Sequence, residues 1–84
     1  MTTQDRKPEP TAAEAYAARR GDIARLLDVL AMELDAHAKR AAVAETNWGY
    51  AGDLHSVRRD LIGVVAFMSG MEIEEVEHFL DDAE

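Results

Sequence analysis

The sequence predicts an all-α fold: an antiparallel helical hairpin followed by a short helix, with two chains dimerising into a helical bundle. Apolar residues recur every three or four positions through two long segments, about 11–46 and about 53–69. The same spacing returns in a short segment, about 72–81. No stretch of useful length alternates polar and apolar residues with the period of two that is typical of strands.

The N-terminal residues 1–10 differ in composition from the rest of the chain. They are polar, include Pro8 and Pro10, and are expected to form a disordered tail, which leaves residues 11–84 as a single small domain. Thr11 and Glu14 have the spacing of a capping box, so a helix is expected to begin there. Gly21 leaves open whether this helix bends or breaks, although the Ala-rich turns before it favour continuity.

The first long helix carries two apolar stripes. The main stripe is one narrow face, made of Ile23, Leu26, Leu27, Leu30, Leu34, Ala38 and Ala41. A second, weaker stripe holds Val29, Met32, Ala36 and Val43. Two stripes on one helix predict two neighbours rather than one.

Residues 47–53 separate the two long helices and are predicted to form the turn of the hairpin. Trp48, the single tryptophan, and Tyr50 are expected to fold back onto the helix ends, with Trp48 at least half buried. Gly49 and Gly52 favour a turn, and Asp53 is the expected N-cap of the second helix.

The second long helix has a main apolar face of its own and is expected to end before a glycine. That face contains Leu54, Val57, Leu61, Val64, Val65 and Met68. Ile62 and Phe67 flank it, and Gly70 suits the left-handed position after a helix C-terminus. The short third helix is expected to turn four apolar side chains inward: Ile73, Val76, Phe79 and Leu80.

The net charge of −8 comes mostly from the C-terminal end of the chain. Residues 72–84 contain seven acidic residues and no Lys or Arg, whereas the preceding residues are nearly neutral. A possible acidic partner surface therefore consists of Glu74, Glu75, Glu77, Asp81 and Asp82. The nine basic residues form no clustered face, so no nucleic-acid partner is expected.

Residues suited to catalysis or metal binding are few. The absence of cysteine excludes disulfides and thiolate chemistry within the chain. Glu75 and His78 have the Glu-x-x-His spacing of di-metal helical bundles, but His78 points away from the apolar face of its helix. His37 is predicted to be partly buried beside the main stripe, with a pH switch or a ligand contact as the alternative. No catalytic residue, metal site or cofactor is predicted.

These features favour a small, acidic, non-catalytic interaction or accessory protein of the bacterial cytoplasm, acting as a homodimer on a protein partner. The expected dimer interface includes Val29, Met32 or Phe67. The first alternative is an acidic inhibitor or decoy, antitoxin-like or DNA-mimicking, and the second is a small metal-dependent helical enzyme. No membrane partner is expected, because the longest apolar run, residues 62–68, falls far short of the roughly 20 residues that span a bilayer. No signal peptide is expected, because the first ten residues are polar and contain no apolar core segment.

Overall fold

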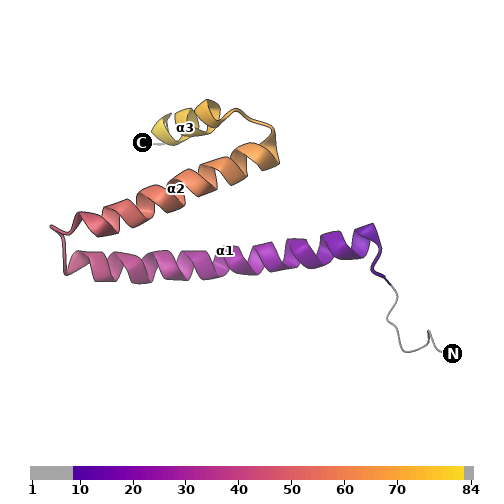
Figure 1. Ribbon diagram of the computed structural model, residues 1–84, viewed down its shortest axis with the longest axis horizontal. Coiled ribbons are helices and arrows are strands. Elements are labelled where there is room, and N and C mark those ends of the chain that lie inside the picture. The colour runs from indigo at the N-terminus through magenta and orange to yellow at the C-terminus, as the bar shows by residue number, and fades with distance from the viewer. Residues whose placement is uncertain (1–8, 83–84) are drawn as a thin grey trace. The chain divides into compact units, whose positions relative to one another are not determined.

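The computed structural model describes residues 9–82, and these residues form three α-helices and no strand (Figure 1). Helix α1 spans Ala12–Ala42, α2 spans Trp48–Ser69 and α3 spans Ile73–Asp82. The all-α class predicted from the sequence is therefore confirmed. The predicted tail at residues 1–10 lies largely outside the described residues. Of the tail, Glu9 and Pro10 are described, and both are exposed and outside any helix.

The chain forms two structural units, residues 1–39 and residues 40–84. The described part of the first unit is the greater part of α1, whose start has the predicted capping box. The Thr11 hydroxyl accepts from the Glu14 N–H at 3.1 Å, and the Glu14 carboxylate accepts from the Thr11 N–H at 2.9 Å. The helix then continues through Gly21 without a break. The high helix propensity of the flanking residues therefore outweighs the cost of one glycine, about 1 kcal/mol.

The second unit begins with the end of α1 and the turn that follows it. The predicted end of this helix near residue 46 is wrong, because α1 ends at Ala42. The Ala44 N–H donates to the Ala41 carbonyl at 3.0 Å and the Asn47 N–H donates to the Ala44 carbonyl at 2.9 Å. These bonds reach back three residues, so they replace the four-residue pattern of the α-helix with two tight turns. The turn occupies residues 43–47 instead of 47–53.

Helix α2 begins earlier than predicted because Asn47, not Asp53, is its N-cap. The Asn47 backbone is extended, with φ −90 and ψ 103, and its side-chain oxygen accepts from the Gly49 N–H at 2.9 Å. Asparagine is as good an N-cap as aspartate, so the first suitable residue after the turn starts the helix. Consequently Trp48, Gly49, Tyr50, Gly52 and Asp53 belong to α2, and the prediction that they form the turn is wrong.

Helix α2 ends at the glycine that the sequence indicated. Gly70 has the left-handed φ of 76°, and its N–H donates to the Ala66 carbonyl at 3.0 Å. The Ser69 hydroxyl donates to the Val65 carbonyl at 2.8 Å and accepts from the Met71 N–H at 3.2 Å. The link to α3 is therefore held by hydrogen bonds on both sides of the glycine.

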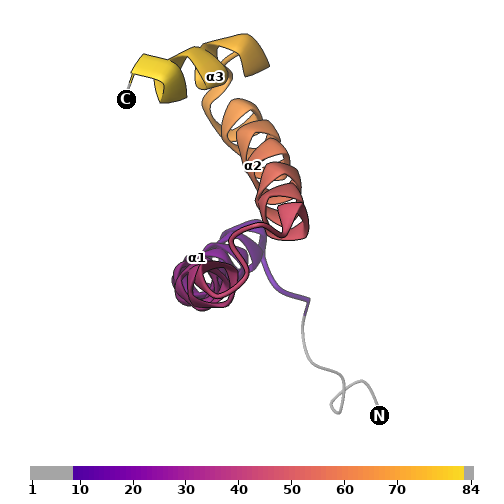
Figure 2. The same cartoon turned by 90° about the vertical axis from the view of Figure 1, so that its left-hand side faces the viewer.

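The buried part of the second unit lies between α2 and α3, which lie beside each other (Figure 1, Figure 2). Ile62 and Val76 are each only 5% exposed. Ile62 was expected merely to flank the main face of its helix, whereas Ile73 and Phe79, which were expected to point inward, are 51% and 66% exposed. The link of residues 70–72 is short, so α3 packs against the side of α2 that Ile62 occupies and not against its main face.

Candidate interaction surface

Large apolar side chains remain exposed on both long helices. Helix α1 has no buried residue. Its exposed large apolar residues are Tyr16, Ile23, Leu26, Leu27, Val29, Met32 and Leu34. Those of α2 are Trp48, Leu54, Leu61, Val64, Val65, Phe67 and Met68. Soluble proteins rarely leave contiguous apolar patches of more than a few hundred square ångströms in water, and larger patches mark interaction sites.

The three residues predicted for a dimer interface are all open to solvent in the chain. Val29 is 49% exposed, Met32 68% and Phe67 86%. Val29 and Met32 lie one turn apart on α1, and Phe67 lies in the last turn of α2. Their exposure leaves them accessible to a partner, and the homodimer itself stays a prediction.

Both long helices have apolar residues at alternating spacings of three and four. On α2 these residues are Tyr50, Leu54, Val57, Leu61, Val64 and Met68. On α1 they are Tyr16, Ile23, Leu27, Leu30, Leu34 and Ala41, with Arg20 and His37 at the two remaining positions. We call each set the seam of its helix. A seam of this spacing is the pattern by which one helix packs along another as in a coiled coil.

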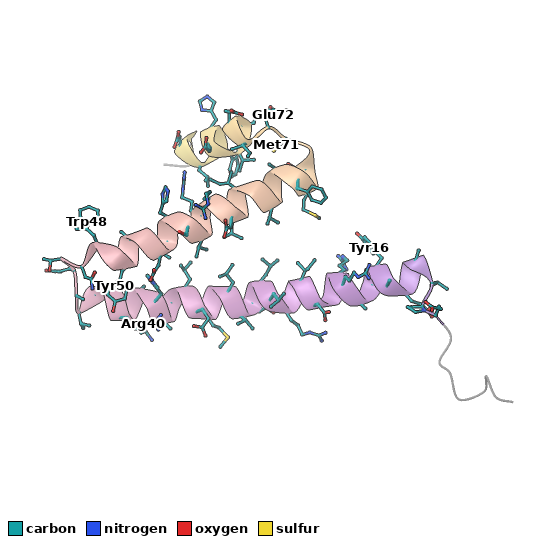
Figure 3. The ribbon with its side chains drawn as sticks, viewed as in Figure 1. Tyr16, Arg40, Trp48, Tyr50, Met71 and Glu72 are labelled. Atoms are coloured by element: carbon teal, nitrogen blue, oxygen red, sulfur yellow. The ribbon has the colours of Figure 1, made fainter. Side chains whose placement is uncertain are left out.

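The aromatic residues near the start of α2 do not form a joint site. Trp48 is 84% exposed, so the prediction that it is at least half buried is wrong. The reason is the earlier helix start, which makes Trp48 a first-turn residue instead of a loop residue folded over helix ends. Trp48 and Tyr50 are two positions apart on the helix and project from different sides of it (Figure 3). They cannot stack together on one ligand.

The acidic side chains of α3 follow the helix in a row opposite its buried residue. Glu74, Glu77 and Asp81 have spacings of three and four, which place them on one exposed face, whereas Val76 is buried on the other. Glu75 is outside this row and caps the helix, because its carboxylate accepts from the Glu72 N–H at 2.8 Å. The side chain of Asp82 lies outside the described residues. The predicted acidic surface is thus a narrow solvated row.

The candidate metal ligands are not gathered into a cluster. Within residues 9–82 no group of three or more His, Cys, Asp or Glu side chains is placed to hold a metal ion. His78 is exposed, and the carboxylate of Glu75 already accepts a backbone hydrogen bond. His55 is exposed in α2, and His37 is half-buried in α1.

Two local features were missed in the sequence although it contains their signals. Asn47 directly precedes the first helical residue, where an N-cap belongs. Glu72 and Glu75 have the spacing at which a side chain in the first turn bonds back to the N-cap amide. The Asn47 signal was outweighed by the stronger expectation that the Gly- and aromatic-containing segment after it forms a loop.

None of the helices in the described residues is long and apolar enough to cross a membrane. Comparisons with protein-family models, with curated proteins and with solved structures found no match.

Proposed function

We propose that the chain is a small, acidic, non-catalytic interaction protein that folds as a helical hairpin, forms a homodimer and acts on a protein partner. The observation that carries the proposal is the apolar surface exposed on both α1 and α2. A cytoplasmic location is part of the proposal, since a chain without cysteine does not depend on disulfides.

The spacing of the two seams supports the hairpin. When α1 and α2 are laid antiparallel about the turn at residues 43–47, the seams meet position by position. The six pairs are Ala41 with Tyr50, His37 with Leu54, Leu34 with Val57, Leu30 with Leu61, Leu27 with Val64, and Ile23 with Met68. One register aligns all six, and it is the register that a short turn imposes.

The residues outside the seams support the homodimer. Val29, Met32 and Phe67 belong to neither seam, so the hairpin does not need them. Full burial of a large apolar side chain contributes about 1.5–3 kcal/mol, so three such residues offer at most about 4.5–9 kcal/mol per chain before the costs of association. That is comparable to the whole stability of an ordinary domain, about 5–15 kcal/mol. A closed two-fold dimer is the commonest assembly that buries such a surface.

The mass of the protein in solution tests the homodimer. Light scattering on a sizing column at micromolar concentration should give a mass near two chains. The variant Phe67→Ser should weaken the dimer, whereas Phe79→Ser, which removes the other phenylalanine from the exposed side of α3, should leave it intact. A mass near one chain, 9.3 kDa, together with a cooperative melt that does not change with protein concentration, would exclude the homodimer.

A second candidate function is favoured by the acidic row of Glu74, Glu77 and Asp81. An acidic inhibitor or decoy would use these carboxylates to occupy a basic surface on its target. The salt dependence of partner binding distinguishes the two functions, because exposed charge pairs are screened at high ionic strength and apolar contacts are not. A partner captured with the wild-type chain should stay bound at 0.5 M salt if the apolar surface holds it. Release of that partner, and loss of capture by Glu74→Gln/Glu77→Gln, would identify a decoy.

A further inference from the structure

One line of α1 carries a cation, an apolar residue and an anion at regular intervals. Arg19, Leu26 and Glu33 are seven residues apart, which places them almost in line along one side of the helix. We call them the charged row. All three are exposed, Leu26 to 64%, and Val29 lies one turn from Leu26. Within residues 9–82 neither Arg19 nor Glu33 has an ion pair, whereas the nearby Arg25 is paired with Asp22 at 3.1 Å.

The charged row is complementary to a reversed copy of itself. Leu26 is the midpoint between Arg19 and Glu33. We propose that two chains pair α1 against α1 in antiparallel orientation, with the two-fold axis at Leu26. Arg19 then faces Glu33 of the partner subunit, and Glu33 faces Arg19 of the partner subunit. This geometry rests on the proposed homodimer and specifies which surface forms it.

The charges disfavour the parallel arrangement. In a parallel pair each residue meets its own copy, so Arg19 would face a second arginine and Glu33 a second glutamate. Like charges held next to each other are destabilising and act as a barrier to wrong pairing. The antiparallel arrangement converts both clashes into attractive pairs and keeps leucine against leucine at the centre.

The charges also select one register among the antiparallel ones. Moving the axis half a heptad toward the C-terminus would place Arg19 against Arg40 and Leu26 against Glu33. Moving it a full heptad would place Glu33 against its own copy. Of these registers, only the one centred on Leu26 places Arg19 against Glu33 and leucine against leucine. In this register residues 12–40 of the two helices overlap, which is nearly the whole of α1.

The dimer contact therefore includes Leu26 and Val29 but not Met32. Val29 is on the side of α1 next to the charged row, and its burial follows from pairing about Leu26. Met32 lies about a third of a turn round the helix from Leu26, on the far side of Val29, as the 100° step per residue requires. Of the predicted interface residues on α1, the proposal thus keeps Val29 and removes Met32, and it concerns α1 alone.

Charge reversal tests the geometry with the full chain. Arg19→Glu leaves two glutamates opposing each other, and Glu33→Arg leaves two arginines, so each variant should dimerise at least tenfold more weakly than the wild type at low salt. An equimolar mixture of the two variants restores both pairs and should form a heterodimer. The double variant Arg19→Glu/Glu33→Arg should form a homodimer. Lys39→Glu makes the same charge change as Arg19→Glu on the opposite side of α1 and should dimerise like the wild type.

The outcomes separate this geometry from the homodimer itself. A wild-type chain that is monomeric overturns the homodimer and the geometry together. A wild-type dimer in which Arg19→Glu dimerises as well as Lys39→Glu keeps the homodimer and overturns the geometry. So does a mixture of Arg19→Glu and Glu33→Arg that remains monomeric while circular dichroism shows both chains helical. Weakening of the dimer in each single variant, together with a homodimer of the double variant, supports the antiparallel pairing, because in a parallel pair all of these chains would have the same two like-charge contacts as the wild type.

Discussion

Replacing Gly70 with alanine should destabilise the protein through the backbone alone. Gly70 has the left-handed φ of 76°, which an L-residue adopts at a cost of about 1–2 kcal/mol. A Cβ at this position meets no other heavy atom within 4 Å, so no steric clash adds to that cost. The left-handed backbone also directs the Gly70 N–H to the Ala66 carbonyl, which caps α2. The expected loss for Gly70→Ala is therefore about 1–2 kcal/mol.

Gly63 provides a matched control in the same helix. A Cβ there also meets nothing within 4 Å, and Gly63 has ordinary helical backbone angles. Alanine is favoured over glycine in a helix interior by about 1 kcal/mol, so Gly63→Ala should stabilise the protein. The same chemical change thus has opposite signs at two positions seven residues apart. The difference depends on backbone conformation and not on the added methyl group.

Thermal unfolding followed by far-UV circular dichroism measures both effects. For a domain of this size each kcal/mol shifts the melting temperature by about 4–8 °C. All chains must be compared at one concentration, because a dimer melts at a temperature that depends on it. An unchanged melting temperature for Gly70→Ala, or a fall for Gly63→Ala as large as that for Gly70→Ala, would refute the assignment of Gly70 as the left-handed cap.

Three further outcomes are expected. Asn47→Ala should lose about 1 kcal/mol of stability, whereas Asn47→Asp should lose little, because a carboxylate oxygen caps a helix as well as an amide oxygen does. Equal losses for the two variants in denaturant unfolding would contradict the assignment of Asn47 as the N-cap. Trp48→Ala should change stability by less than about 0.5 kcal/mol, and native fluorescence should peak at a solvated wavelength, since the ring is 84% exposed. Deleting residues 1–10 should leave the melting temperature nearly unchanged, and a fall of several degrees would show that the segment packs.

Helix ends were predictable from the sequence where a single capping residue or pair sets them. Thr11 and Glu14 determined one helix start, and Gly70 determined one helix end, because each acts through its own backbone or side chain. The turn between α1 and α2 was placed several residues too late. Glycines and aromatics indicated a loop at Gly49 and Gly52, but a helix tolerates two glycines once a capped start precedes them.

The packing of α3 was harder to predict because periodicity does not determine which neighbour a helix meets. The spacing of apolar residues on α2 identified a main face, yet the residue that α3 buries is Ile62, beside that face. The short link through Gly70 decides this, since it limits which side of α2 a ten-residue helix reaches. The apolar residues predicted for an interface and the acidic row of α3 are exposed, and their contact with a partner stays a prediction.

The placement of α3 has a consequence for the proposed hairpin. Because α3 covers Ile62, it leaves the seam of α2 open, and a second long seam of matching spacing is what can fill it. Helix α1 has such a seam, and the charged row runs along the edge of that seam. Glu74, Glu77 and Asp81 lie in a row opposite Val76, so this row adds no like charge to the packed side of α3. Helix α3 thus packs one side against α2 and turns its acidic row to solvent, and the hairpin and the homodimer proposed above would give α1 and α2 the further burial that a chain of 84 residues needs.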